Sequence, residues 1–433
     1  METRLASWIR DTADGHAAEQ ILRACVHCGF CLATCPTYQL LGDELDGPRG
    51  RIYQIKQVLE GTDPGRQTQI HLDRCLTCRN CETTCPSGVA YGHLVEIGRV
   101  AVAQRVRRPL VERLLRWTLK EGLTRPTLFA AVLGLFRSVA PLLPGRWRAK
   151  LGVARPAGAW PSTARARTVL LPRGCTQPAM LPSIDAATAR VLDAIGVQVI
   201  VAEGARCCGA IRQHLEDHAG ALSQFRRNID AWWPYIEARQ IEAIISNASG
   251  CGATIREYAY ALRDDPSYAA KAQRIVELTR DLVEFLGPEL TAGSCGQERS
   301  AAPTTALQPP PGQIAEPPPR RIAFHPPCTL QHGLRIRGEV EKLLTSLGAQ
   351  LVPVAEAHLC CGSAGTYSLL QPALAQALRE RKLAQLLHEQ PQMLLSANIG
   401  CIAHLQGGTG IPVRHWIEWV DAELAARRHV PPD

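Results

Sequence analysis

Two runs of four cysteines constrain this chain more strongly than any other feature of its sequence. The first run is Cys25-x2-Cys28-x2-Cys31-x3-Cys35-Pro36, and the second is Cys75-x2-Cys78-x2-Cys81-x3-Cys85-Pro86. This spacing is typical of bacterial [4Fe–4S] proteins, in which three closely spaced cysteines bind one cluster and the fourth, before proline, binds the other. The sequence therefore predicts one cluster at Cys25, Cys28, Cys31 and Cys85, and a second cluster at Cys75, Cys78, Cys81 and Cys35.

Zinc is the alternative metal for these runs, because four thiolates also form a closed structural zinc site. Zinc sites usually draw on two separated cysteine pairs, whereas each run here ends in Cys-Pro and is continuous, which favours iron. The spacer between Cys35 and Cys75 is longer than in small two-cluster ferredoxins, and apolar residues such as Ile52, Ile55 and Val58 lie in it at helical spacing. Residues 1–98 are therefore predicted to form a helical two-cluster ferredoxin-type domain.

A second set of cysteines occurs as a repeat. The first copy contains a Cys-Cys-Gly sequence and two more distant cysteines, and the second copy repeats the pattern about 150 residues later. The cysteines of the two copies are Cys175, Cys207, Cys208 and Cys251, and then Cys328, Cys360, Cys361 and Cys401. The residues around them repeat as well, which indicates a duplicated unit.

Both copies have the same order of expected elements: strand, helix, strand, Cys-Cys-Gly turn, helix, strand. The expected strands are Val169–Leu171, Val197–Val201 and Ala243–Ser246 in the first copy, and Ile322–Phe324, Leu351–Val354 and Met393–Ser396 in the second. A helical segment ending at Leu286 closes the first copy, and an amphipathic helix over Val413–Leu424 closes the second. Alternating strands and helices predict two α/β units.

The predicted fold class is thus a multidomain α+β protein, with an N-terminal helical two-cluster ferredoxin domain followed by two duplicated α/β cysteine-rich units. The predicted divisions are 1–98 for the ferredoxin-type domain, 99–164 for a basic helical connector, 165–287 for the first unit, 288–320 for a linker and 321–427 for the second unit. The linker holds eight prolines and Cys295, to which we assign no role.

Composition excludes several classes of protein. The N-terminal residues lack the long apolar core of a secretory signal, so a reducing cytoplasm is expected, where clustered cysteines are metal ligands rather than disulfides. The longest apolar run, Leu128–Phe136, falls well short of the roughly 20 residues that span a bilayer, so no transmembrane helix is predicted.

The positive charge is concentrated in one segment. The whole chain has a net charge of +8, yet residues 99–150 alone carry twelve Lys and Arg against Glu112 and Glu121. The rest of the chain is slightly acidic, which argues against a nucleic-acid-binding protein. The basic segment can be a solvated helical face, a docking surface for acidic subunits or, with Trp117 and Phe136 among its arginines, a patch that contacts a membrane surface.

The Cys-Cys-Gly repeats are a candidate for further metal binding. The side chains of adjacent cysteines diverge and reach two different metals more easily than one, which suits a site with several irons. The alternative is a pair of ordinary buried cysteines. The tentative ligands are the eight cysteines of the two repeats together with His404, which follows Cys401 by three residues, whereas Thr254 holds that position in the first repeat. Because threonine is a poor iron ligand, any additional cluster is expected in the second unit, with His404 as a ligand.

Longer motifs carry a resemblance to a known family. They are Leu22-Arg23-Ala24-Cys25-Val26-His27-Cys28-Gly29, Cys35-Pro36-Thr37-Tyr38, Gly47-Pro48-Arg49-Gly50-Arg51-Ile52, His71-Leu72-Asp73-Arg74-Cys75-Leu76-Thr77-Cys78-Arg79-Asn80-Cys81, Ala231-Trp232-Trp233-Pro234, Cys360-Cys361-Gly362-Ser363-Ala364-Gly365-Thr366-Tyr367 and Val413-Arg414-His415-Trp416-Ile417-Glu418. The two repeats resemble the cysteine-rich domain of the heterodisulfide reductase superfamily. Over residues 1–425 the chain resembles the iron–sulfur subunits of glycolate oxidase (glycolate dehydrogenase).

This resemblance implies an electron-transfer subunit of an oxidoreductase. Partner subunits carrying FAD would oxidise glycolate to glyoxylate, and this chain would pass the electrons to an acceptor, quinone, through peripheral contact with the cytoplasmic face of the inner membrane. The sequence has no flavin or nicotinamide fingerprint, so the chain alone is predicted to be inactive on glycolate and to hold no catalytic residue. The alternatives are the iron–sulfur subunit of a lactate or glycerol-3-phosphate dehydrogenase, a thiol-disulfide catalyst at the Cys-Cys-Gly sites, and a zinc-stabilised scaffold.

Overall fold

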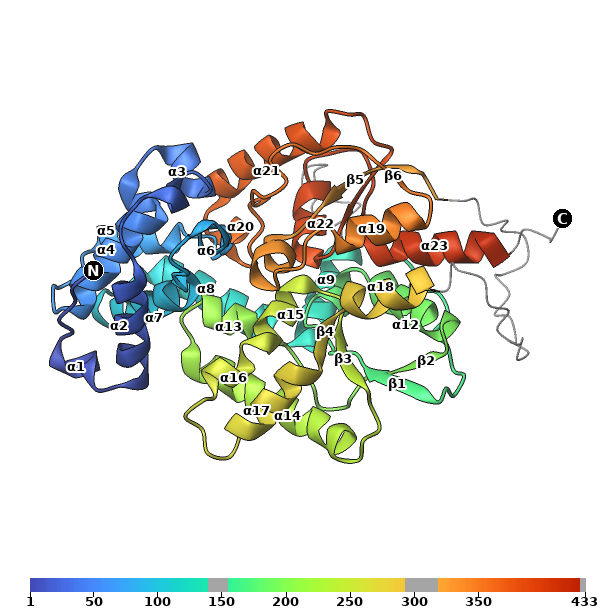
Figure 1. Ribbon diagram of the computed structural model, residues 1–433, viewed down its shortest axis with the longest axis horizontal. Coiled ribbons are helices and arrows are strands. Elements are labelled where there is room, and N and C mark those ends of the chain that lie inside the picture. Colours follow the sequence, from blue (N-terminus) through green and yellow to red (C-terminus); the bar gives the residue numbers. More distant parts are fainter. Residues whose placement is uncertain (139–154, 293–317, 429–433) are drawn as a thin grey trace.

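A computed structural model describes residues 1–138, 155–292 and 318–428 of the chain. Cys295, most of the predicted linker, and residues 139–154 of the predicted basic connector lie outside these ranges. Figure 1 shows the N-terminal helices gathered at one end of the molecule, with two sheet-containing units beside them. The predicted fold class, a helical domain followed by two α/β units, is confirmed.

The N-terminal domain is built from short helices around the two cysteine runs. These are α1 (Ser7–Arg10), α2 (Ala13–Ala24), η1 (Phe30–Leu32), α3 (Pro36–Leu41), η2 (Glu44–Asp46), α4 (Pro48–Leu59), α5 (Arg66–Asp73), α6 (Asn80–Thr84) and α7 (Tyr91–Arg105). α4 and α7 pack closely because Gly98 lies directly against the Ile55 side chain, where a Cβ would meet Ile55 Cγ1 at 2.6 Å. Leu59 and Leu94 complete this core, so the loops that carry the cysteines are held on a packed helical frame.

Two further helices, α8 (Leu110–Leu123) and α9 (Pro126–Ser138), continue from this domain and pack against α13 (Ala210–His214) and α11 (Gln177–Met180), helices of the first sheet unit. They occupy the segment predicted as a basic helical connector. No helix in the described ranges is both long enough and apolar enough to cross a membrane.

The first unit is a parallel sheet with the strand order β2-β1-β3-β4. Its strands are β1 (Arg167–Leu170), β2 (Val197–Ile200), β3 (Ala243–Ser246) and β4 (Thr279–Asp281). Its helices are α11 (Gln177–Met180), α12 (Ser183–Ala194), α13 (Ala210–His214), α14 (His218–Glu237), α15 (Ser249–Arg256), α16 (Tyr258–Ala261), α17 (Ala269–Leu278) and α18 (Leu282–Ala292).

The second unit repeats this topology in the order β6-β5-β7-β8, again all parallel. Its strands are β5 (Arg321–His325), β6 (Gln350–Leu351), β7 (Met393–Ser396) and β8 (Val413–His415). Its helices are η4 (Thr329–Gly333), α19 (Glu339–Ser346), α20 (Tyr367–Leu370), α21 (Pro372–Leu387), α22 (Ile399–Gln406) and α23 (Trp416–Arg428). In both units the side chains of the central strands are buried on both faces, as is usual for parallel sheets covered by helices.

The structure corrects the expected ends of both units. Each sheet has a fourth strand, β4 or β8, in a segment that we predicted to be helical. Each of these strands is three residues long and runs directly into a helix, so it is too short to give a period-2 pattern of its own. In addition, α18 continues through Pro288 to Ala292, which places its last turn inside the predicted linker.

The two units share one hydrophobic core. Residues of β1 and β3 belong to the same buried cluster as residues of β5 and β7. Polar contacts cross the same boundary: Ser183 Oγ donates to Glu418 at 2.7 Å, and the Ser249 amide donates to the Ala397 carbonyl at 3.1 Å. The two units therefore pack against each other through a shared core and do not form independent domains.

Candidate iron–sulfur sites

The first cysteine pocket lies between the first run and the end of the second. Its wall contains the thiols of Cys25, Cys28, Cys31 and Cys85, with Cys81 also on the lining. Cys28 is exposed, and the neighbouring side chains of Val26 and Phe30 are 68% and 62% exposed. This pocket therefore opens at the surface of the N-terminal domain.

The second cysteine pocket is lined by Cys35, Cys75, Cys78 and Cys81. Cys35, Cys75 and Cys81 are buried. The two pockets share Pro48, Cys81 and Tyr91 on their linings, so they are adjacent. The grouping of thiols is the one that the run pattern predicts, and their ligation of iron stays a prediction.

The backbone has the same unusual conformation in both runs. The residues on either side of the second cysteine have positive φ: His27 (56°) and Gly29 (86°) in the first run, and Thr77 (52°) and Arg79 (58°) in the second. Alternation with left-handed residues curls the chain so that successive amides turn toward one side, which forms a concavity suited to an anionic group such as an iron–sulfur cluster. Gly29 is required by space as well, since a Cβ there would meet Arg49 Nη1 at 2.7 Å.

The chemistry of the thiols also fits a metal. Burial and the neighbouring Cys25 raise the pKa of the Cys31 thiol to about 11. Burial raises the pKa of Cys81 as well, with Cys78 and Cys75 adding to the effect. Such crowded thiols hold their protons until a cation replaces them, which is the behaviour of a preformed metal site.

Arginines stand beside both pockets, but their environments differ. Arg51 is buried; it donates to the His71 carbonyl at 2.7 Å and to Thr37 Oγ1 at 3.2 Å, and it pairs with Asp46 at 3.4 Å. It lines the second pocket. Arg49 lines the first pocket, and its side chain is 35% exposed. The second pocket thus has a buried cation, whereas the first has one shared with solvent.

Further donors are aimed at the second pocket. The Tyr91 hydroxyl donates to Cys75 Sγ at 3.6 Å, and the Thr77 amide donates to the same sulfur at 3.4 Å. Arg99 donates to the Cys75 carbonyl at 2.6 Å and to Thr77 Oγ1 at 3.1 Å. Donors to ligand sulfurs and buried positive charge both stabilise the reduced, more negative state of an iron–sulfur cluster.

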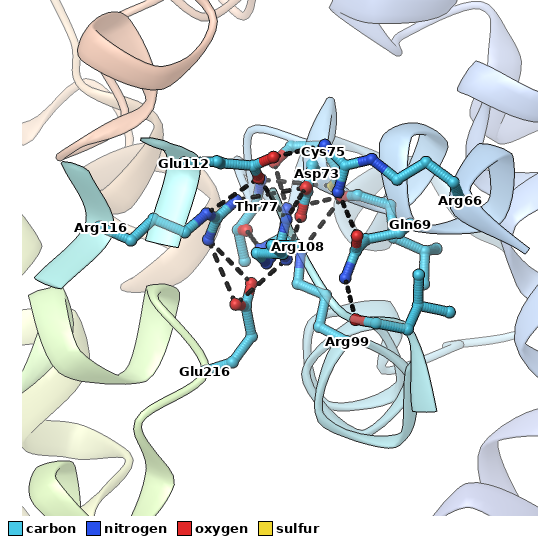
Figure 2. A network of polar contacts seen from close by, with 12 residues as sticks. Arg66, Gln69, Asp73, Cys75, Thr77, Arg99, Arg108, Glu112, Arg116 and Glu216 are labelled. Carbon is cyan, nitrogen blue, oxygen red and sulfur yellow. Dashed lines mark hydrogen bonds and ion pairs between the residues drawn. The ribbon is translucent and has the colours of Figure 1, made fainter. Parts of the chain in front are cut away.

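A network of ion pairs joins this pocket to α8 and to the first unit (Figure 2). Arg108 and Arg116 lie between the carboxylates of Asp73, Glu112 and Glu216. Arg116 pairs with Asp73 at 3.2 Å and with Glu216 at 3.2 Å. The network connects Asp73, the last residue of α5 and two residues before Cys75, to α8 and to Glu216 of the first unit.

In the first unit the four repeat cysteines come together. The Cys207 thiol is in hydrogen-bonding contact with Cys175 and Cys208, and Cys208 is in contact with Cys251. Cys175, Cys207 and Cys208 are buried. Gly209 follows with a φ of 95°, and a Cβ on it would lie 2.3 Å from the Phe225 ring, so glycine is needed for this turn.

The second unit gathers its cysteines in the same manner. Cys328 contacts Cys360, Cys360 contacts Cys361, and Cys361 contacts Cys401. Cys328 also contacts Cys78, one of the thiols that line the second pocket. The row of sulfur contacts therefore runs without interruption from the N-terminal domain into the second unit.

The histidine beside this group differs from the one that the sequence suggested. His404 Nε2 lies 3.1 Å from the Ala375 carbonyl. Instead, His325, at the end of β5, lies with its ring nitrogen within 4.8 Å of the sulfurs of Cys361 and Cys401. Burial, with Lys382 nearby, holds the pKa of His325 well below its usual range, so the imidazole is neutral. Spacing from Cys401 pointed to His404, but the helix α22 turns that side chain toward α21.

Sequence reasoning missed several other residues of these sites. Arg51, Arg99 and Tyr91 were not singled out, although Arg51 stands inside one of the quoted motifs. The contact between Cys78 and Cys328 joins residues 250 positions apart, and local patterns do not encode such proximity. For His325 a signal was available, since it precedes a repeat cysteine by three residues and ends a strand.

Comparisons with known proteins agree with this layout. The model of the 4Fe-4S dicluster domain matches residues 21–89. The model of the cysteine-rich domain matches twice, over residues 169–256 and 322–406. The matched regions enclose both cysteine runs and both repeat sets, which indicates that the chain binds iron–sulfur clusters.

Comparison with individual proteins identifies the family more closely than the domain matches do. The chain is 50% identical to the glycolate oxidase iron-sulfur subunit of Escherichia coli (strain K12), over 98% of this chain and 99% of the relative. It is 29% identical to the probable glycolate oxidase iron-sulfur subunit of Bacillus subtilis (strain 168), over 89% of this chain and 88% of the relative. Lactate utilization protein A of Bacillus subtilis (strain 168) is 24% identical over 53% of this chain and 86% of that protein. With half of its residues identical across nearly the full length of both chains, this protein belongs to the family of glycolate oxidase iron–sulfur subunits.

Proposed function

We propose that this chain receives electrons from flavin-bearing partner subunits that oxidise glycolate to glyoxylate, and passes them toward quinone. The observation that carries the proposal is the arrangement of the thiol sites. One pocket opens at the surface beside Val26 and Phe30, the second adjoins it, and the second touches the thiols of the second unit through Cys78 and Cys328. When bound, the clusters supply one-electron transfer, and FAD belongs to the partners.

In this proposal Cys25, Cys28, Cys31 and Cys85 hold one [4Fe–4S] cluster, and Cys75, Cys78, Cys81 and Cys35 hold the other. The protein's own contribution is to keep the sites adjacent and to set their surroundings. Exposed apolar residues at the first pocket give a partner a surface to dock on. At the second pocket, Arg51 and the Tyr91 hydroxyl favour the reduced state, so electrons are drawn inward.

The function is tested by a reconstitution assay. We expect the purified, flavin-free chain to leave a redox dye unreduced with glycolate, and the chain co-purified with its flavin subunits to reduce it. D-lactate and glycerol 3-phosphate serve as competing substrates under the same conditions. Turnover by the flavin-free chain, or a complex that prefers lactate or glycerol 3-phosphate, contradicts the proposal.

Contact with a membrane surface is the second part of the proposal, and it rests on the orientation of α8. This helix turns its charged side inward. Glu112 and Arg116 pair with residues of the N-terminal domain and the first unit (Figure 2), and Lys120 pairs with Asp217 of the first unit. Its apolar side faces outward, with Leu110 77% exposed and Leu114 64% exposed. A surface helix normally has the opposite orientation, so this face is built to be covered.

The neighbouring helix has the same property. α9 carries only one charged residue, Arg137, which donates to the carbonyls of Ala179 and Met180, yet Leu128, Leu135 and Phe136 are exposed. Arg113 on α8 and Arg107, just before this helix, are exposed, and within the described ranges neither pairs with a carboxylate. Leucine, aromatic residues and unpaired arginine on one surface fit a lipid interface with anionic headgroups. On this ground we propose that the chain binds peripherally to the cytoplasmic face of the inner membrane.

Vesicle binding tests this surface. The native chain is expected to sediment with vesicles that contain phosphatidylglycerol and much less with phosphatidylcholine alone. Leu114→Glu should abolish that binding, whereas Leu369→Glu, at another exposed leucine, should not. If Leu114→Glu leaves vesicle binding intact and instead blocks co-purification of the flavin subunits, the surface docks protein rather than lipid.

The cysteine-rich units form the third part of the proposal. The thiol groups Cys175, Cys207, Cys208 and Cys251 and Cys328, Cys360, Cys361 and Cys401 are each compact enough to offer a metal several sulfurs. We place an additional metal site in the second unit, because only that group adjoins the second pocket through Cys78 in the described contacts.

A further inference from the structure

His325 has no partner that explains its burial. Its side chain lies at the end of β5 and is 1% exposed. Neither Nδ1 nor Nε2 has a hydrogen-bond partner among the described residues. Burying two polar ring atoms without partners is unfavourable, so an ordinary core position would have been filled by an apolar side chain.

The ring lies among sulfur atoms. One ring nitrogen and the sulfurs of Cys361 and Cys401 are all within 4.8 Å of one another. Cys361 is buried and Cys401 is half-buried, so solvent has little access to the space between these three donors. A neutral imidazole with two nearby thiols is a typical set of ligands for zinc or iron.

The first unit lacks this histidine. His325 precedes Cys328 by three residues, and the residue that precedes Cys175 by three is Pro172. His325 is the last residue of β5 and Pro172 lies two residues after β1, so both stand at the end of the first strand of their unit and are equivalent in the duplicated topology. A proline side chain offers no donor atom, and the difference between the two units is therefore one of ligand chemistry as well as sequence.

We propose that His325, Cys361 and Cys401 are ligands of one transition-metal ion in the second unit, whereas Pro172, at the equivalent position of the first unit, supplies no ligand. The inference rests on the additional metal site proposed above for that unit and assigns its histidine ligand. Cys360 and Cys328 continue the sulfur group on the side that faces Cys78. The ion belongs either to an iron–sulfur centre or to a zinc site, since thiolate and imidazole suit both.

The metal content of the full chain tests the assignment. The chain is purified anaerobically, and iron, sulfide and zinc are measured per chain for the native protein, His325→Asn and the control His404→Asn. The native protein should hold metal in addition to the eight irons expected from two [4Fe–4S] clusters. His325→Asn should lose that additional metal and keep the eight irons, and His404→Asn should keep both.

The identity of the ion follows from the element that is lost. If it is iron, protein labelled with 15N-histidine should give a nitrogen coupling in pulsed EPR that is absent from His325→Asn. If it is zinc, X-ray absorption of the native protein should contain a histidine contribution that the same variant lacks. His325→Cys, which supplies a thiolate at the same place, should restore the metal content without the nitrogen signal.

Three results overturn the inference. If His325→Asn retains the additional metal with the same spectrum, another residue is the ligand and the metal site itself survives. If the native chain holds no metal beyond the eight irons, the additional site fails together with its histidine. Should His325→Asn lose all its iron through misfolding, His325→Cys decides: a folded His325→Cys chain without the additional metal also contradicts the proposal.

Discussion

The two cysteine pockets have the same sequence pattern and the same left-handed backbone, but they differ in what surrounds them. The first pocket has an exposed cysteine, Cys28, and an arginine, Arg49, that is shared with solvent. The second has the buried Arg51, a hydroxyl on Cys75 Sγ and a thiol of the second unit against Cys78. A repeated motif thus supplies the cysteines of both pockets, while the surrounding fold leaves the first pocket open to solvent and encloses the second.

The largest effect is expected from the cross-ligated cysteines. Although Cys85 belongs to the second run, Cys85→Ser should resemble Cys28→Ser and remove the cluster of the first pocket. Cys35→Ser should resemble Cys78→Ser and remove the other cluster. Each variant should lose about four irons per chain and abolish glycolate-dependent dye reduction in the complex. Iron analysis and EPR of the reduced protein measure this, and full iron content in these variants would refute the assignment.

A smaller but still large effect is expected from Arg51→Met. The variant leaves Asp46 without one of its buried partners and removes a positive charge from beside Cys35 and Cys75. We expect a loss of about 3 kcal/mol in the free energy of unfolding. The midpoint potential of the second cluster should fall on the order of 60 mV, a tenfold step for a one-electron couple.

Arg49→Met is the matched control for that experiment. Its ion pair with Glu44 is partly exposed on both sides, so solvent screens it and its removal should cost about 0–1 kcal/mol. EPR-monitored redox titration compares the two variants. Equal shifts in both would show that burial of the arginine does not distinguish the pockets.

The next effect concerns exposure to air. Oxidants reach accessible sulfur first, so the cluster beside the exposed Cys28 should be lost several-fold faster than the cluster of the second pocket. Iron loss is followed in air for Cys35→Ser and Cys85→Ser, each of which retains one cluster. Cys35→Ser should lose its remaining iron faster, and the reverse order would contradict the difference in exposure.

The smallest effect is expected from Tyr91→Phe. The ring lines both pockets, but its hydroxyl donates only to Cys75 Sγ. Loss of one hydrogen bond to sulfur should lower the potential of the second cluster by less than Arg51→Met does and leave the first cluster unchanged. A shift in the first cluster alone would show that the hydroxyl acts on the other pocket.

Much of the fold could be predicted because its signals are local. The strands Ala243–Ser246 and Met393–Ser396 lie where their apolar residues indicated, and the repeat of Cys-Cys-Gly revealed the duplication. β6 is shorter than expected, ending at Leu351. β4 and β8 could not be predicted, since three residues followed by a helix contain no full alternation.

For the thiol sites, too, local sequence patterns predict only part of the arrangement, because some neighbouring residues are far apart in the sequence. The spacing within each run predicted which cysteines line the same pocket. The fourth cysteine, before proline, is expected to join the cluster of the other run, and this can be read from each run by itself. His404 was chosen as a ligand by its distance in sequence from Cys401, and its ligation of a metal stays a prediction. The histidine beside Cys361 and Cys401 is His325, because parallel β5 and β7 bring their ends together. The strand order decides which residues are neighbours across a parallel sheet, and the spacing of residues along the chain does not reveal that order.

The contact between Cys78 and Cys328 has a consequence for how the protein is made. Asn80 donates to the His358 carbonyl at 3.1 Å and the Tyr367 hydroxyl donates to the Arg74 carbonyl at 3.2 Å, so the second unit covers the loop that carries Cys78. A carrier protein that delivers iron and sulfide needs open access to that loop. We therefore expect iron and sulfide to be delivered to this loop before the second unit docks over it, because docking covers the loop.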